Sequence, residues 1–171
     1  LVSGGTLEAT RIRAGLGSSS LNFDGGRFRA TQSGSIFTGF DAGDIQILTD
    51  GAIIDSQAFN LASSAILQGS GGLIKEGNGI LTLNGANQYA GGTEINGGTL
   101  RVSSDGNLGN ASGGVTFDGG TLQVTNSFLT DRTLTLSGDG TIQTDEALVA
   151  RGNITGSGGL TKNGANNLTL T

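Results

Sequence analysis

Residues 69–102 read GSGGLIKEGNGILTLNGANQYAGGTEINGGTLRV, and their pattern is the clearest indication of the architecture. Short segments that alternate apolar and polar residues, such as Leu81-Thr82-Leu83, lie between glycine pairs that begin at Gly71, Gly91 and Gly97. Strict alternation over a few residues is typical of a strand with one buried face. The stretch therefore predicts several short strands that are joined by glycine-rich corners.

The glycine pairs recur along the whole chain at regular distances. The pairs at Gly4 and Gly25 are 21 residues apart, and those at Gly97 and Gly119 are 22 apart. A unit of this length, with two or three strands and no helix, is typical of a strand solenoid. Eight pairs hold 16 of the 33 glycines, and they begin at Gly4, Gly25, Gly71, Gly91, Gly97, Gly113, Gly119 and Gly158.

A longer repeat lies on top of this short unit. The segment 69–83 recurs at 156–170, with Gly-Ser-Gly-Gly-Leu-x-Lys-x-Gly followed by Leu-Thr-Leu in both copies. The displacement is 87 residues, which corresponds to about four short units of the solenoid. We therefore expect the best repeat at 69–102 and a truncated second copy at 156–171.

These spacings predict an all-β protein, a right-handed parallel β-helix of roughly eight turns of about 21 residues. Residues 1–171 would form a single β-helical segment. The best helical candidate is Ser56–Leu67, and its alternative is a strand pair with a bend at Asn60. Only the interval from Gly26 to Gly71 leaves room for an extra loop between turns.

Composition excludes several classes of function. The 171 residues include no Cys and no His, so disulfides, zinc–thiolate sites and Ser-His-Asp triads are ruled out. Nine Lys and Arg stand against fourteen Asp and Glu, which argues against nucleic acid as a partner because phosphate contacts require clustered positive charge. Only carboxylate chemistry remains open to an enzyme of this composition, and no cofactor is expected.

Residues 69–102 closely resemble the passenger-associated repeat of bacterial autotransporters, and residues 156–171 resemble its opening part. The pattern has a Gly-Ser-Gly-Gly-Leu-x-Lys-x-Gly opening, a Leu-Thr-Leu strand, an Asn-x-Tyr-x-Gly-Gly-Thr turn and a Gly-Thr-Leu-x-Val close. The matching positions in the first copy are Gly69, Gly71, Gly72, Leu73, Lys75, Gly77, Leu81, Leu83, Tyr89, Gly91, Gly92, Thr93, Gly97, Gly98, Leu100 and Val102. Those in the second copy are Gly156, Gly158, Gly159, Leu160, Lys162 and Gly164.

The resemblance implies a segment of a secreted passenger that is displayed outside a Gram-negative cell. In that family a signal peptide precedes the passenger, and a C-terminal membrane barrel follows it and is the passenger's own partner. The first residues, Leu1–Leu7, look like the last quarter of a repeat, so we expect a piece of a longer protein. The resemblance further implies that such repeats assist export, because folding outside the cell discourages backsliding.

Four arginines near the N-terminus form a candidate ligand face, namely Arg11, Arg13, Arg27 and Arg29. If their two strands lie on adjacent turns, all four side chains would point outward and attract an acidic glycan or a sulfated matrix polymer. The alternative is a solvated face on which Glu8, Asp24 and sheet neighbours pair with the arginines.

Lysine, tyrosine and asparagine side chains of the motif are further candidates for a specific role. Lys75 and Lys162 are expected to be structural, with the stem over the strand and the ammonium free, although a positioned lysine is also the base of some β-helix polysaccharide lyases. The resemblance to the family repeat implies that Tyr89 lies in the turn before Gly91. Asn84, Asn87 and Asn96 flank that turn and are expected to bond to backbone groups at corners.

The acidic residues offer two weaker candidates. Asp24 and Asp118 occupy matching Phe-Asp-Gly-Gly segments, but about four turns of ~4.8 Å separate them, which is too far for a pair of glycosidase carboxylates. Both are expected to make hydrogen bonds at corners. Calcium ligation by Asp41 with Asp44, or by Asp139 with Asp145 and Glu146, is weighed against solvated turn acids.

Three functions remain open at this point. The leading interpretation is a structural, adhesin-like passenger segment on the cell surface that assists its own export. The second is a direct binding module for host glycan, matrix protein or another copy of itself. The third is a β-helix polysaccharide lyase or hydrolase, which short intervals between glycine pairs disfavour because they leave little room for a catalytic cleft.

Overall fold

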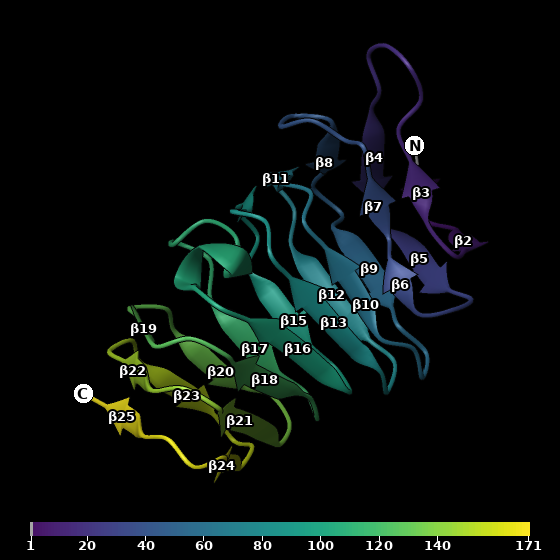
Figure 1. Ribbon diagram of the computed structural model, residues 1–171. Coiled ribbons are helices and arrows are strands. Elements are labelled where there is room, and N and C mark those ends of the chain that lie inside the picture. Colours follow the sequence, from purple (N-terminus) through teal and green to yellow (C-terminus); the bar gives the residue numbers. More distant parts are fainter. Residues whose placement is uncertain (1) are drawn as a thin grey trace.

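The computed structural model describes residues 2–171 as 25 short strands and one 3₁₀ helix; the partial repeat expected from Leu1 begins outside this range. All paired strands run parallel (Figure 1). The longest ladder is an eight-stranded sheet of β2 (Thr6–Ala9), β5 (Gly26–Ala30), β9 (Ala52–Asp55), β12 (Leu73–Glu76), β15 (Thr93–Ile95), β17 (Val115–Phe117), β20 (Leu134–Leu136) and β23 (Ile154–Gly156).

Four further sheets complete the architecture. The seven-stranded sheet contains β6 (Gly34–Ser35), β10 (Leu61–Ser63), β13 (Ile80–Leu83), β16 (Thr99–Val102), β18 (Thr121–Val124), β21 (Gly140–Thr144) and β24 (Leu160–Asn163). The five-stranded sheet contains β1 (Val2–Ser3), β4 (Leu21–Asp24), β8 (Ile45–Ile47), β11 (Leu67–Gly69) and β14 (Gln88–Tyr89). The three-stranded sheet contains β19 (Phe128–Thr130), β22 (Leu148–Ala150) and β25 (Leu168–Leu170), and the two-stranded sheet contains β3 (Ile12–Arg13) and β7 (Phe37–Thr38).

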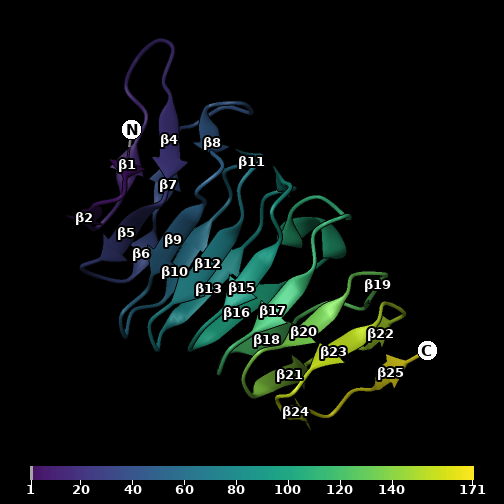
Figure 2. The same cartoon turned by 180° about the vertical axis from the view of Figure 1, so that it is seen from behind.

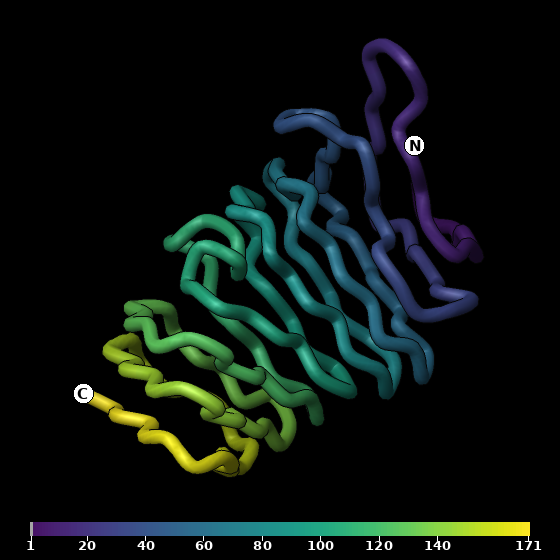
Figure 3. The backbone as a smooth tube through the Cα atoms, in the orientation of Figure 1, coloured from purple at the N-terminus to yellow at the C-terminus, as the bar shows by residue number. Residues whose placement is uncertain are grey.

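Each turn of the chain visits three faces in a fixed order. In the third and fourth turns, the five-stranded sheet is followed by the eight-stranded and then the seven-stranded sheet. The coils stack along one axis, and the two ends of the chain lie at opposite ends of the stack (Figures 2 and 3). Eight strands in one sheet give eight turns, so the predicted parallel β-solenoid and its number of turns are confirmed.

Turn length is nearly constant, with one exception. Register partners along the eight-stranded sheet lie 19 to 22 residues apart, except that Arg27 pairs with Ile53, 26 positions later. This long turn falls inside the interval from Gly26 to Gly71 that was expected to hold an extra loop. The extra residues are therefore confined to the second turn.

The face of the solenoid that the five-stranded sheet forms changes its structure near the middle of the stack. After β14 the five-stranded sheet ends, and a 3₁₀ helix, η1 (Asp105–Leu108), takes its place in the next turn. The three-stranded sheet then occupies the same position in the order of strands. The sequence analysis did not anticipate this excursion, which is visible in Figure 1 between β16 and β17.

The core is one narrow column of inward side chains. Phe28, Ile54, Ile95 and Phe117 lie in register along the eight-stranded sheet and are at most 1% exposed. Each such burial stabilises the fold by roughly 1.5 to 3 kcal/mol relative to exposure. The apolar motif positions are also inward and buried: Leu73, Leu81, Leu83, Leu100 and Val102.

The helical candidate Ser56–Leu67 is not a helix. The chain turns at Gln57, which has a positive φ of 51°, and β10 starts at Leu61 directly after Asn60. The segment is therefore extended as the alternative predicted, but the chain turns at Gln57 and not at Asn60. Inward Leu61 and Ser63 satisfy the strand period, which outweighs the weak helical pattern.

Glycine pairs mark two different corners of the solenoid. Five pairs precede strands of the eight-stranded sheet, and the pairs at Gly97, Gly119 and Gly158 precede strands of the seven-stranded sheet. The 87-residue displacement is therefore not a whole number of turns. Leu73 lies in the eight-stranded sheet, whereas its counterpart Leu160 lies one face further on, in the seven-stranded sheet. The estimate of about four units is corrected to four turns and one face.

Candidate functional site

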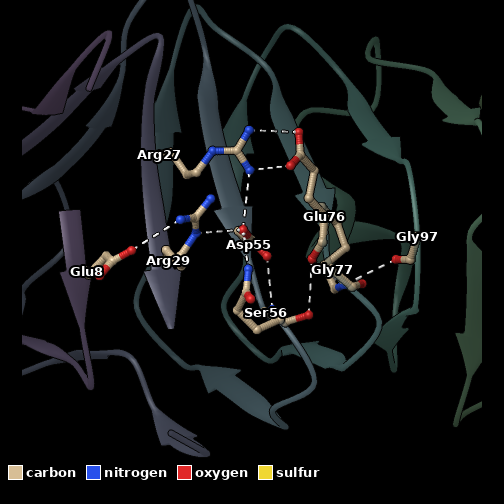
Figure 4. Close-up of polar contacts among 10 residues, drawn as sticks. Glu8, Arg27, Arg29, Asp55, Ser56, Glu76, Gly77 and Gly97 are labelled. Atoms are coloured by element: carbon tan, nitrogen blue, oxygen red, sulfur yellow. Dashed lines mark hydrogen bonds and ion pairs between the residues drawn. The ribbon is translucent and has the colours of Figure 1, made fainter. Parts of the chain in front are cut away.

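A charge ladder covers part of the outer face of the eight-stranded sheet. Glu8, Arg29, Asp55 and Glu76 are register neighbours on four successive turns. Arg29 lies 3.1 Å from both Glu8 Oε1 and Asp55 Oδ2, and Arg27 donates to Asp55 and to both oxygens of Glu76 (Figure 4). The ladder ties the first four turns together.

These contacts shift the pKa values of two residues of the ladder region, Asp55 and Arg27. Burial acts to raise the pKa of the Asp55 carboxyl, but hydrogen bonds from Gln57 and Arg29 and the charge of Arg27 bring the pKa below its usual value. The hydrogen bond to Glu76 raises the pKa of Arg27. The three acids thus neutralise Arg27 and Arg29 locally, as the solvated-face alternative predicted for Glu8. Asp24 has no part in this ladder.

The other two arginines lie elsewhere. Arg13 is on β3, which pairs with β7 in the two-stranded sheet, and Arg11 precedes this strand. Both side chains are exposed, and neither makes an ion pair within residues 2–171. The structure therefore does not bring the four arginines of the candidate ligand face into one sheet, because β5 and β3 belong to different sheets.

Lys75 is buried inside the solenoid with 0% exposure. It interrupts the apolar column between Ile54 and Ile95. Its ammonium donates to the carbonyl oxygens of Glu76 at 2.8 Å, Gly77 at 2.8 Å and Gly97 at 3.1 Å. The expectation of a free ammonium is wrong, because the inward strand position leaves corner carbonyls as its only partners.

Burial lowers the pKa of Lys75 to about 8, against the opposing effect of the Asp55 and Glu76 charges. A buried amine with this pKa resembles a catalytic base in its titration. Its three hydrogen bonds go to the protein's own backbone, however, and the side chain is closed to solvent. The arrangement therefore joins two turns and offers no access to a substrate.

The second-copy lysine occupies an equivalent position on another face. Lys162 continues the inward column of Leu122 and Ile142 in the seven-stranded sheet, but it is exposed. Its ammonium donates to Gly164 O, two residues on, as Lys75 does to Gly77 O. The motif thus repeats the local contact of the lysine without its burial.

Tyr89 and Thr93 form the closed turn that precedes β15. The Tyr89 hydroxyl lies 2.8 Å from Thr93 Oγ1, which in turn lies 3.2 Å from Leu108 O and donates to it. Tyr89 is 0% exposed, and burial raises the pKa of its hydroxyl. These bonds fix the corner against η1.

Of the three asparagines that were expected to bond to backbone groups at this corner, only Asn87 does so among residues 2–171. Asn87 accepts from Leu67 N at 2.9 Å and donates to Asn107 O at 2.7 Å, linking three turns. Asn84 has no side-chain hydrogen bond within the described chain, and Asn96 Oδ1 is buried there without a partner. The corner bonding is therefore concentrated in Asn87.

Two comparisons relate this chain to known proteins. Residues 73–102 match the passenger-associated-transport-repeat family. Over 88 residues the chain is 47% identical to the adhesin BmaC autotransporter of Brucella suis biovar 1 (strain 1330). The aligned part is 52% of this chain and 3% of that protein, so the chain corresponds to a small piece of its relative. No solved structure matches the chain significantly.

Over the residues that these matches cover, the chain is similar to autotransporter passengers. The matched residues run from β12 to the end of β16, so the family repeat contains Lys75, Tyr89 and Thr93 together. The resemblance recognised in the sequence is thereby confirmed. The repeat covers one and a half turns of the passenger segment, and its polar side chains bond across turns.

The passenger segment has a second buried cation that sequence reasoning missed. Arg132 is 2% exposed and donates to both carboxylate oxygens of Asp105 and to the carbonyl oxygens of Asp105, Asn110, Gly113 and Gly109. Arg132 therefore fixes the backbone of the segment that runs from η1 to β17. An arginine after a short strand carries no motif, so only its contacts reveal this role.

The acidic candidates do not converge on a site. Asp44 accepts from the Asp41 amide, Asp139 accepts from Gly159 N, and Asp145 accepts from Gln143 and Gln123. In the described residues no three acids gather where they could hold a metal ion. The Asp50 amide lies 3.5 Å from Asp24 Oδ1, which is long for a hydrogen bond.

Asp24 ends β4 of the five-stranded sheet, whereas Asp118 follows β17 of the eight-stranded sheet. The matching Phe-Asp-Gly-Gly segments therefore lie at different corners. A membrane-spanning helix is also lacking, since no helix between residues 2 and 171 is long and apolar enough to cross a bilayer.

Proposed function

We propose that this passenger segment is a structural part of an adhesin-like autotransporter, which extends the molecule from the cell surface and assists its own export. The observation that carries the proposal is the uninterrupted eight-turn stack, in which the family repeat supplies bonds between turns. Stability in such a stack comes from contacts between neighbouring turns, so each turn that emerges can fold on the previous one.

The proposal assigns no catalytic role to the segment. The carboxylates are separated or bound to neighbouring donors, and Lys75 and Arg132 are enclosed by backbone carbonyls. We further propose that the segment acts at the bacterial surface, joined in its parent protein to a membrane barrel. The named relative, an adhesin autotransporter, supports this location.

The experiment uses deletions in the full-length parent that differ only in register. Removing residues 73–92 deletes one whole turn, because Leu73 pairs with Thr93, and Gly72 is then joined to Thr93 at the same corner. Removing residues 73–82 deletes half a turn and moves the following strands to the wrong face. Surface display is measured by protease accessibility on intact cells.

We expect near-normal display after the whole-turn deletion and reduced display after the half-turn deletion, since only the second interrupts stacking. Equal display of both deletions would contradict the assisted-export part of the proposal. Adhesion of cells that carry the whole-turn deletion shows whether the deleted turn is a spacer or a surface that contacts the adhesion target. Retained adhesion supports the structural role, and lost adhesion at full display contradicts it.

A further inference from the structure

The long second turn leaves a cavity beside the seven-stranded sheet. Ser35 pairs with Ala62, and pairing between these two turns resumes only where Ile45 meets Leu67. Between these pairs the second turn contains nine residues, 36–44, and the third turn contains four, 63–66. The two segments cannot stay in register, so they diverge.

The cavity has a volume of about 310 Å³, and aromatic and hydroxyl side chains line it together. Phe37 is buried, and Phe40 is half-buried against the core. The other side chains that the cavity exposes are Ser35, Thr38, Ser64 and Ala65. Small-molecule sites have this size at their lower limit, and they combine apolar walls with a few polar groups.

One hydroxyl that lines the cavity has no partner. Thr38 Oγ1 is buried without a hydrogen bond, and it is one of three such side-chain atoms in residues 2–171. A buried hydroxyl without a partner destabilises the state in which it is buried. A ligand that reached Thr38 after rotation of its side chain would relieve this destabilisation.

Arg13 lies beside the cavity. It is the register partner of Thr38 across the β3–β7 ladder, and Ala14 N donates to Thr38 O at 2.9 Å. The Arg13 side chain is exposed, and within the described chain it makes no ion pair. Arg13 does not line the cavity, but its five N–H donors have no ion-pair partner in residues 2–171 and belong to the strand next to Thr38.

We propose that this cavity binds one sugar ring of a glycan, with the apolar face of the ring on Phe40 and ring hydroxyls bonded to Thr38 and Arg13. The inference deepens the adhesin-like function proposed above and rests on it for its biological meaning. A sugar suits the site because it presents an apolar face and several hydroxyls at once, matching an aromatic wall with hydroxyl neighbours.

The surrounding charges favour a neutral hexose over an acidic sugar. The loop that follows Phe40 carries Asp41 and Asp44, and Asp44 already accepts from the Asp41 amide. Arg11 and Arg13, which are exposed and make no ion pair in the described chain, balance these two carboxylates. A region without net charge offers no overall attraction to the carboxylate of a uronic acid.

Saturation-transfer NMR on the 171-residue chain tests the site with D-galactose, D-glucose and D-glucuronic acid as probes. We expect saturation transfer to ring protons of a neutral hexose and weaker transfer to glucuronic acid. Phe40→Leu keeps apolar volume without a ring, and we expect it to weaken hexose binding by about fivefold. Thr38→Val keeps shape without the hydroxyl, and a loss of about fivefold is again expected.

Thr99→Val, an outward threonine of the seven-stranded sheet outside the cavity, is the matched control and should bind as the unchanged chain does. No transfer to either hexose, or equal losses in all three variants, would overturn the site. Tighter binding of glucuronic acid would overturn the choice of a neutral sugar.

The parent protein carrying Phe40→Leu separates this site from the passenger role. Unchanged surface display together with weakened hexose binding supports the site. Reduced display would show that Phe40 serves the fold and would overturn its assignment as a ligand contact. Absent hexose binding with normal display would reject the site alone and leave the passenger function standing.

Discussion

The two copies of the motif, residues 69–83 and 156–170, share a backbone conformation but lie on different faces of the solenoid. Gly77 and Gly164 both have positive φ, 78° and 87°. The glycines that follow Ser70 and Ser157 both press against the carbonyl of the preceding turn, where no side chain would fit. The lysine-bearing strand of copy one, β12, nevertheless lies in the eight-stranded sheet, and that of copy two, β24, lies in the seven-stranded sheet.

The lysines show what this difference means. Lys75 is enclosed by turns on both sides and makes three carbonyl bonds, whereas Lys162 is exposed and makes one. Local sequence therefore sets the shape of a corner, and the number of stacked neighbours sets how much its side chains contribute. Each prediction below tests whether corner shape and stacking act separately.

The largest effect is expected from truncating the buried lysine. Lys75→Ala leaves three carbonyls without their donor and opens a cavity, so it should destabilise β12 and its neighbours by about 3 to 4 kcal/mol. Lys162→Ala, the matched control, should change the stability of β24 by less than about 0.5 kcal/mol. Hydrogen exchange of individual strand amides measures both. Similar losses in the two variants would contradict the dependence on stacking.

The glycines should behave in the opposite way, with equal effects in the two copies. Gly77→Ala and Gly164→Ala each place a residue with a Cβ in the left-handed backbone region. The added Cβ also presses against the preceding turn. Each should cost about 2 kcal/mol, measured by the same exchange experiment. A large cost in the first copy alone would mean that corner geometry also depends on the face.

Raising the pH should stabilise the first copy selectively. The pKa of Lys75 in the folded state, about 8, lies below the unfolded value of 10.5, so the unfolded chain binds more protons between these values. The unfolding free energy relative to Lys75→Met should therefore rise by about 1 to 2 kcal/mol between about pH 7.5 and about pH 9.5. Paired denaturation of both proteins across this range measures the difference, and a flat difference would exclude a depressed pKa.

The smallest effect concerns the outward acid of the motif. Glu76 binds Arg27 two turns away, whereas the corresponding residue of the second copy is Asn163. Glu76→Asn makes the copies alike and should cost about 0.5 kcal/mol at low salt, with less lost at high salt because exposed pairs are screened. Thermal unfolding at two salt concentrations tests this, and a loss that salt leaves unchanged would point to packing instead.

Much of the fold could be predicted because glycine pairs and alternating strands are local signals. The solenoid, its eight turns and the site of the enlarged turn all follow from the spacing of glycines. The contacts of Lys75 and Arg132 could not be predicted in the same way. Lys75 donates to Gly97 from 22 positions away, and Arg132 reaches Asp105 from 27 positions away.

The arginines illustrate the same limit. Arg11, Arg13, Arg27 and Arg29 look equivalent in the sequence, but the chain crosses to another sheet between β2 and β3. Arg27 and Arg29 therefore meet Asp55 and Glu76, whereas Arg13 lies beside Thr38. A charge pattern identifies candidates, and the register of the strands decides which of them are neutralised.

The architecture, the family of the repeat and the conformation of each corner can be read from local sequence, because strand period and positive φ depend on neighbouring residues alone. The face that each copy occupies, the burial of one lysine and the position of the cavity are apparent only in the folded chain. Those properties depend on the summed lengths of all preceding turns. One turn of 26 residues, from Arg27 to Ile53, is enough to open a site that no motif marks.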